Sequence, residues 1–227
     1  MAPNFGDPTL FPTFQELSSS TPASPPFLLA QIREDMTITK PTLIVRDRTG
    51  AEFAVTFDDG DHRGLDAPPS SSSAAPHDLL TAGGGASAGK RFRRGHTLVV
   101  PAAAREARGG GGKKDVVRVP RGGGAAVRVL PAPLERVLEV GAVMAAVAHE
   151  ERSGSDGEGG GARRKTRCGA CGKDEDEGEG EEKVSLMRCT GCGTVAYCSK
   201  ACQVRGWSEL DHKTNCKLIR AIKEIWP

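Results

Sequence analysis

The sequence is poor in aromatic residues, which make up 4% of its 227 positions, whereas glycine alone fills 29 of them. Large side chains supply most of the buried area of a domain core, and glycine supplies no side chain to pack. A chain of this composition cannot be packed core along its whole length. We therefore expect one modest folded domain, a smaller unit and long disordered segments.

A strong net charge, a secretory start and a long apolar run are also missing. The net charge is +2, which excludes strong overall attraction to nucleic acid. Residues 1–4 lack a basic start followed by an apolar run, and no stretch approaches the roughly 18 apolar residues of a membrane helix. We expect an intracellular protein, in the nucleus or the cytoplasm, with no membrane span.

Cysteine is absent outside one stretch, which holds all seven cysteines of the chain. An odd number fits badly with a disulfide framework, and nothing points to an oxidising compartment. Together with one histidine the cysteines form four pairs: Cys168-x2-Cys171, Cys189-x2-Cys192, Cys198-x3-Cys202 and His212-x3-Cys216. Seven thiolates and one imidazole make eight ligands, the number required by two tetrahedral zinc ions. Four protein ligands per ion leave no position for water, so the zinc is expected to be structural.

The spacing within each pair has a direct physical reason. Two residues between cysteines let a tight turn direct both sulfur atoms at one ion, and three residues place ligands at i and i+4 on one helix face. Four pairs can be grouped into two sites in three ways, and spacing alone does not choose between them.

This stretch resembles the MYND-type zinc finger. Besides the eight ligands, the matching residues are Tyr197 and Ser199 around Cys198, Gln203 after Cys202, Trp207, and Lys213 after His212. The resemblance implies a cross-braced arrangement, with Cys168, Cys171, Cys198 and Cys202 on one zinc ion and Cys189, Cys192, His212 and Cys216 on the other. It also implies that Gln203 and Trp207 contact a short proline-containing peptide, laid along a small hairpin beside the Tyr197 strand. An acidic insert at 174–182 and a longer spacer at 209–211 depart from the family pattern.

The region before the finger predicts a small β-rich domain, which makes the whole chain α+β. Strands are expected at 42–48 and 52–57 around a turn at 49–50, and again at 96–101, 116–119 and 127–130, followed by an apolar-faced helix at 134–151. We predict a disordered N-terminal arm (1–37), a β-rich domain (38–152) with a low-complexity insert (58–90), a linker (153–167), the finger (168–216) and a helical extension (217–227). The order also resembles the region upstream of the finger in small fungal MYND-type proteins, through residues 40–57, 95–98 and 130–131.

These patterns favour a zinc-binding interaction adaptor without catalytic activity. An enzyme is one alternative, since some MYND fingers interrupt protein-lysine methyltransferases, but no large flanking domain or cofactor motif is recognisable. A non-catalytic remnant or partner of a chromatin or methyltransferase system is another. A nucleic-acid-binding finger is disfavoured by the seven carboxylates of the acidic insert. Self-interaction is a further hypothesis, because Pro8, Leu10 and Pro12 form a Pro-x-Leu-x-Pro motif that some MYND fingers accept.

Overall fold

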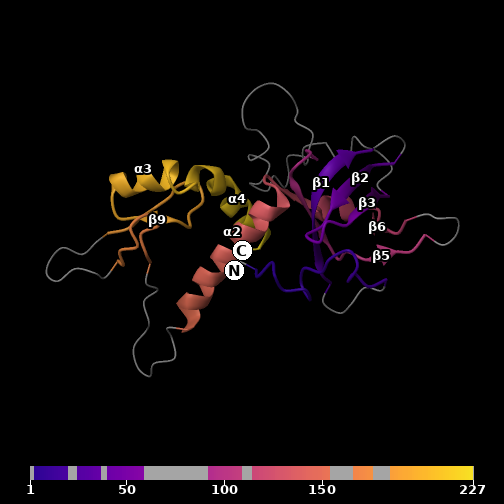
Figure 1. Cartoon of the computed structure of the whole chain (residues 1–227), viewed down its shortest axis with the longest axis horizontal. Helices are drawn as coiled ribbons and strands as arrows, with labels where there is room; N and C mark the ends of the chain where they lie inside the picture. Colours follow the sequence, from indigo (N-terminus) through magenta and orange to yellow (C-terminus); the bar gives the residue numbers. More distant parts are fainter. Residues whose placement is uncertain are drawn as a thin grey trace. The chain divides into compact units, whose positions relative to one another are not determined.

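The computed structural model describes residues 3–19, 25–36, 40–58, 92–108, 114–153, 166–175 and 185–226, without the side chains of 147–153. The chain divides into two compact units (Figure 1). Residues Asn4–Glu139 form the first, called here the β unit, and Val140–Pro227 with Met1–Pro3 form the second, called the finger unit. The division falls within a helix, earlier than the predicted boundary near residue 153. The predicted insert and linker lie outside the described residues, except for Asp58, Ser153, Thr166 and Arg167.

A seven-stranded sheet forms the β unit, and its strands follow one another in the order β5-β6-β3-β2-β1-β4-β7. Figure 1 labels five of them, β1, β2, β3, β5 and β6. The bounds are β1 Phe27–Asp35, β2 Thr42–Arg46, β3 Glu52–Phe57, β4 Thr97–Pro101, β5 Arg105–Glu106, β6 Val116–Val119 and β7 Arg128–Leu130. A 3-10 turn, η2 (Gly123–Ala126), precedes β7. All neighbouring strands pair antiparallel except β3 and β6, which are parallel. Five of these strands were predicted from the sequence, whereas β1 and β5 were not.

The β2–β3 hairpin forms as its sequence predicts. Alternate side chains of both strands are buried, which is the period of a sheet with one covered face. Gly50 takes a φ of 86° in the connecting turn, a conformation that favours glycine. The carboxylate of Asp47 accepts hydrogen bonds from the Thr49 amide, the Thr49 hydroxyl and the Ala51 amide at 2.7–3.1 Å. The turn is therefore held by its own first residue.

The prediction of a disordered N-terminal arm is wrong for the described residues of 1–37. Residues 27–35 form β1, which lies between β2 and β4 inside the sheet. Phe5, Phe11 and Phe14 are buried, and the ring of Phe14 stacks on that of Phe53 with centroids 4.1 Å apart. The spacing of these rings suggests disorder because they share no helical or strand face. Phe5 instead packs edge-on to Phe11, Phe11 lies next to Phe27 of β1, and Phe14 joins the core of the sheet.

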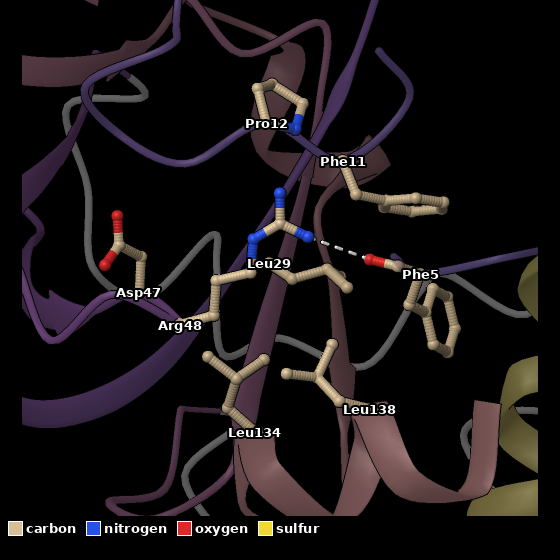
Figure 2. A pocket seen from close by; sticks show the side chains of 8 residues that line it. All are labelled: Phe5, Phe11, Pro12, Leu29, Asp47, Arg48, Leu134 and Leu138. Atoms are coloured by element: carbon tan, nitrogen blue, oxygen red, sulfur yellow. Dashed lines mark hydrogen bonds between the residues drawn. The ribbon is translucent and has the colours of Figure 1, made fainter. Parts of the chain in front are cut away.

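Hydrogen bonds attach the arm to the β2–β3 turn. The amide of Phe14 donates to the Asp47 carboxylate at 2.9 Å. The Arg48 guanidinium donates to the Phe5 carbonyl at 3.1 Å, as Figure 2 shows. Figure 2 shows the cavity at this junction, lined by Phe5, Phe11, Pro12, Leu29, Asp47, Arg48, Leu134 and Leu138. Its volume of about 10 Å³ is room for about one water molecule. The cavity is thus a packing defect of the arm and no ligand site.

The Pro-x-Leu-x-Pro motif of the arm is folded against the β unit. Residues 8–10 form a turn in which the Phe11 amide donates to the Asp7 carbonyl at 2.8 Å, and the Phe27 amide donates to the Leu10 carbonyl at 2.7 Å. Pro12 is buried. A peptide ligand of the expected kind is extended and has its backbone groups available. In this conformation Pro8, Leu10 and Pro12 do not present the extended peptide that self-interaction through the finger requires.

The helices and a second, two-stranded sheet complete the described structure. Helix α2 runs from Leu134 to Ser153, close to its predicted bounds. The finger unit adds β8 (Met187–Arg188), β9 (Ala196–Tyr197), α3 (Lys200–Ser208) and α4 (His212–Ile225). Helix α4 continues past Cys216 as predicted, with Ile219 and Ile222 buried. None of the described helices combines the length and apolarity that crossing a bilayer requires.

Candidate metal centre and interaction surface

The eight predicted ligands converge into two sets of four. One set, called site 1, is Cys168, Cys171, Cys198 and Cys202, and the other, site 2, is Cys189, Cys192, His212 and Cys216. Within each set the ligand atoms all lie within 4.8 Å of one another. This is the cross-braced grouping that the family resemblance implies. It is one of the three groupings that the spacing alone allows.

The distances between ligand atoms suit a tetrahedral zinc ion. Zn–S bonds of about 2.3 Å at tetrahedral angles separate the sulfur atoms by about 3.8 Å. The Sγ atoms of Cys171 and Cys198 are 3.5 Å apart, and those of Cys189 and Cys216 are 3.8 Å apart. The Sγ of Cys192 is 3.8 Å from Nε2 of His212. All seven cysteines are free thiols, so the donor sets fit two zinc ions, each held by four protein ligands.

Both Cys-x2-Cys turns share one backbone design. The amide of Gly172 donates to the Cys168 carbonyl at 2.9 Å, and the amide of Gly193 donates to the Cys189 carbonyl at 2.8 Å. These two glycines have φ values of 77° and 65°. A residue with a β-carbon is strained at such angles. A glycine directly after each Cys-x2-Cys pair is the sequence signal for these turns, and the prediction from the ligands alone did not include it.

The later ligands come from the two helices. Ser199 caps α3, its side chain accepting a hydrogen bond from the Cys202 amide, and this positions Cys202 in the first turn. His212 and Cys216 lie on the first turns of α4 at i and i+4, and both are buried. Cys198 precedes α3, so the predicted helical i, i+4 relation holds for His212 and Cys216 but not for Cys198 and Cys202.

Two further glycines make room for the sites. A β-carbon on Gly191 would lie 2.8 Å from Sγ of Cys216, inside van der Waals contact. A β-carbon on Gly206, in the middle of α3, would lie 2.3 Å from Cε1 of Tyr197. Tyr197 is only 2% exposed and its ring packs edge-on to that of His212, with centroids 6.0 Å apart. Gly206 thus lets α3 approach the aromatic residue that supports site 2.

The protonation of the ligands follows from burial and mutual contact. Burial alone would raise the pKa of Cys168, but hydrogen bonds from the Cys171, Cys198 and Ala170 amides outweigh it and lower the pKa to about 6. Hydrogen bonding with Cys202, then with Cys171, raises the pKa of Cys198 to about 12. Burial lowers the pKa of His212, which keeps its imidazole neutral and able to act as a ligand.

In site 2, as in site 1, burial and contacts between the ligands change the pKa of the cysteines. Burial, and then the hydrogen bond with Cys189, raises the pKa of Cys216 to about 12. Neighbouring thiols at 3.5–3.8 Å cannot all carry negative charge unless a cation lies among them. A bound zinc ion would supply that positive charge and displace the remaining protons. The clusters are therefore arranged for a divalent cation.

The first residue of the acidic insert is paired with an arginine that precedes the finger. Asp174, the first residue of the insert, is buried, and its carboxylate accepts a hydrogen bond from Arg167 at 2.7 Å. Arg167 and Asp174 thus neutralise each other's charge at the start of the insert. Residues 176–182 of the insert lie outside the described residues.

The two predicted peptide-contact residues lie on the exposed face of α3. Gln203 is exposed, and the Trp207 side chain one turn later is 41% exposed. The Trp207 ring packs edge-on to His212 with centroids 5.7 Å apart. Val204 is 58% exposed beside them. At Ala196, strand β9 has a neighbour on both sides, namely β8 and the segment at Cys168, so its edge is closed at this residue.

Comparison with known proteins agrees with this geometry. The family model of the MYND finger matches residues 168–216. Histone-lysine N-methyltransferase SMYD3 of Homo sapiens is 44% identical over 45 residues, which is 20% of this chain and 10% of that protein. SET domain and MYND-type zinc finger protein 6 of Schizosaccharomyces pombe is 46% identical over 44 residues, 19% of this chain and 9% of that protein. The chain thus spans about a tenth of the length of these relatives. Residues 168–216 are therefore a MYND finger, a zinc-binding protein-interaction domain with two four-ligand sites.

Proposed function

We propose that the finger is an adaptor module that captures short proline-containing peptides of other proteins on the exposed face of α3. The observation that carries the proposal is the position of Trp207, whose indole is 41% exposed although its edge packs on the zinc ligand His212. An aromatic ring fixed at its base and open to solvent presents a rigid apolar contact at low entropic cost.

Gln203 provides the polar part of this contact. It lies one turn before Trp207 on α3 and is exposed, and within the described part of the chain its side chain makes no hydrogen bond. Proline lacks an amide proton, so a proline-containing peptide offers mainly carbonyl acceptors, which the Gln203 amide can donate to. Because the β9 edge is closed at Ala196, we assign the peptide to the α3 face and not to pairing along β9.

The test measures binding of a fluorescein-labelled Pro-x-Leu-x-Pro peptide to the full zinc-loaded chain by anisotropy. Trp207→Ala is expected to weaken binding at least tenfold, as truncation of an aromatic anchor commonly does. Gln203→Ala is expected to weaken it severalfold, because one hydrogen bond contributes about 1 kcal/mol. Thr214→Ala, an exposed position on α4, is the matched control.

Zinc content separates recognition from folding in this test. Gln203→Ala and Thr214→Ala should both retain two zinc ions per chain, since neither residue is a ligand. Wild-type affinity in both Gln203→Ala and Trp207→Ala would contradict the proposal. Loss of zinc from Gln203→Ala would show instead that Gln203 is structural.

We also propose that the chain acts inside the cell and without catalysis of its own. Reduced thiolates persist in reducing compartments, and four protein ligands per zinc ion leave no position for a reacting water. One relative is named a histone-lysine N-methyltransferase, so methyl transfer from S-adenosylmethionine to histones is the activity to assay. No transfer is expected, and transfer by the purified chain would refute this part of the proposal.

A further inference from the structure

Exposed apolar side chains gather on α3 and the residues that follow it. Val204, Trp207 and Leu210 are 58%, 41% and 44% exposed. They are three of the seven large apolar side chains that the described residues leave exposed, and they lie within seven consecutive positions. Exposed apolar residues scattered singly need no explanation, whereas a contiguous group marks a contact surface.

The third member of this group comes from the longer spacer between α3 and α4. The amides of Glu209 and Leu210 both donate to the Arg205 carbonyl, at 2.9 and 3.3 Å. The two amides share one carbonyl where α3 ends, which holds Leu210 close to the last turn of the helix. Val204, Trp207 and Leu210 thus lie at i, i+3 and i+6 along the chain. The spacer thus lengthens the apolar stripe by one side chain. We call Val204, Trp207 and Leu210 the α3 stripe.

Lysines flank the α3 stripe. Lys200, one turn before Val204, begins α3, and Lys213 follows His212, whose ring is 5.7 Å from that of Trp207. Neither lysine has an ion-pair partner within the part of the chain that the structure describes. The nearby Arg205, by contrast, is paired with Glu209 at 3.5 Å. Lys200 and Lys213 are both exposed and thus available to a partner, one before and one after the stripe in the chain.

We propose that the α3 stripe and these two lysines select a particular kind of peptide. It has a proline-containing core, a second apolar side chain outside that core, and acidic residues on either side of this apolar segment. The second apolar side chain would contact Leu210, and the carboxylates would face Lys200 and Lys213. The inference rests on the proposed function and deepens it. A peptide is favoured over nucleic acid because phosphates would pair with the lysines but leave Val204 and Leu210 unused.

The experiment compares three labelled 14-residue peptides on the full zinc-loaded chain. The first carries the Pro-x-Leu-x-Pro core, an additional leucine and Asp/Glu flanks. The second replaces the additional leucine with alanine, and the third replaces the acidic flanks with lysine. The variants are Leu210→Ala and the double charge reversal Lys200→Glu with Lys213→Glu. Lys173→Glu, an exposed lysine in the site 1 turn, is the charge control.

Wild type is expected to bind the first peptide at least threefold more tightly than the second and about tenfold more tightly than the third, with the latter ratio falling as salt is raised. Leu210→Ala should abolish only the leucine preference, and the double reversal only the acidic preference. Lys173→Glu should retain both. Unchanged preferences in the variants would overturn the inference, as would equal competition by a 14-nucleotide single-stranded DNA.

The Trp207→Ala variant separates a failure of the proposed specificity from a failure of the peptide site itself. If Trp207→Ala weakens all three peptides while Leu210→Ala and the double reversal change no ratio, the peptide site stands and only this specificity is wrong. If Trp207→Ala binds every peptide as wild type does, the proposed function itself fails and the specificity fails with it.

Discussion

At the scale of single residues, Asp47 connects segments that are far apart in the sequence. One carboxylate oxygen binds the turn residues Thr49 and Ala51, and the other accepts the amide proton of Phe14 at 2.9 Å. A buried carboxylate is costly unless it is fully hydrogen-bonded, and here backbone amides satisfy it. The turn itself was predictable from Thr49-Gly50. The bond to Phe14 was not, because nothing local in the sequence links positions 33 residues apart.

Another carboxylate, that of Glu16 in the N-terminal arm, makes the stability of the β unit depend on pH. Glu16 accepts hydrogen bonds from the Thr13 amide and from the Thr13 hydroxyl, both at 2.8 Å. These bonds, the amide first, hold the pKa of Glu16 below its ordinary value of 4.5. A depressed pKa contributes stability above the unfolded value, and this contribution is lost as pH falls through the folded value. The free energy of unfolding should therefore decline below about pH 4.5.

Glu16→Gln is predicted to flatten this decline and to lower stability at neutral pH, measured by urea unfolding across the pH range. Glu34→Gln is the matched control, since Glu34 is exposed and its side chain has no hydrogen bond or ion pair among the described residues. Parallel pH profiles for Glu16→Gln and wild type would show that the Thr13 contacts do not act in solution.

At the scale of elements, the sequence predicts those whose periodicity is local. Strands β2 and β3 alternate buried and partly exposed residues, and α2 repeats its apolar residues at helical spacing. Strand β1 was missed because its apolar run follows a proline- and serine-rich stretch that masks it. Strand β5 has only two residues and forms solely through its pairing with β6. Strand β5 thus depends on a tertiary contact that no local pattern encodes, whereas β1 carries an apolar run of its own.

The eight zinc ligands were all predictable, because zinc chemistry restricts both residue type and spacing. Their grouping was not predictable from spacing, since it depends on which turns the fold brings together. The supporting glycines were also missed. Gly172 and Gly193 need a positive φ, and Gly191 and Gly206 need space against a neighbour. Only the structure shows what surrounds these positions.

Helix α3 provides a test of this packing. Alanine is about 1 kcal/mol more favourable than glycine in a helix interior, so local propensity alone predicts that Gly206→Ala stabilises α3. The β-carbon would however lie 2.3–2.7 Å from three atoms of the buried Tyr197 side chain. We expect Gly206→Ala to destabilise the finger by about 1–3 kcal/mol, as overpacked cores do.

The measurement is the chelator concentration that releases half of the bound zinc, together with near-ultraviolet circular dichroism of the tyrosine. Thr214→Ala, at an exposed position of α4, should behave as wild type. A Gly206→Ala chain that holds zinc more tightly than wild type would show that helix propensity outweighs the contact with Tyr197.

At the scale of the whole molecule, the ligands alternate between sites along the chain. The pair 168/171 belongs to site 1, 189/192 to site 2, 198/202 to site 1 and 212/216 to site 2. Neither site can close without drawing the intervening pair of the other site into place. Structural zinc supplies roughly 10–16 kcal/mol of apparent binding energy in small fingers, so the two sites should fold as one cooperative unit.

We predict two zinc ions per wild-type chain and fewer than one in Cys189→Ser, although this substitution removes a ligand of site 2 only. Thr190→Ser, an exposed neighbour, should retain both ions. Inductively coupled plasma mass spectrometry gives the stoichiometry. Chelation of wild type should abolish amide-exchange protection in residues 185–226 and leave that of β1 to β4 intact, since these lie in separate units. A Cys189→Ser chain that keeps one full zinc ion would show that the sites are independent.

The alternating order of the ligands has a consequence for synthesis on the ribosome. The first four ligands to emerge are Cys168, Cys171, Cys189 and Cys192, two from each final site. Two Cys-x2-Cys pairs are themselves a complete tetrahedral donor set, so a nascent finger can bind one zinc ion in a pairing that the finished protein does not use. That ion would have to exchange two of its cysteine ligands once Cys198 and Cys202 have been synthesised. Thiolate exchange on the growing chain, more than zinc affinity, would then determine how fast the finger matures, and cobalt absorption of a fragment ending at Gly193 would reveal the transient site.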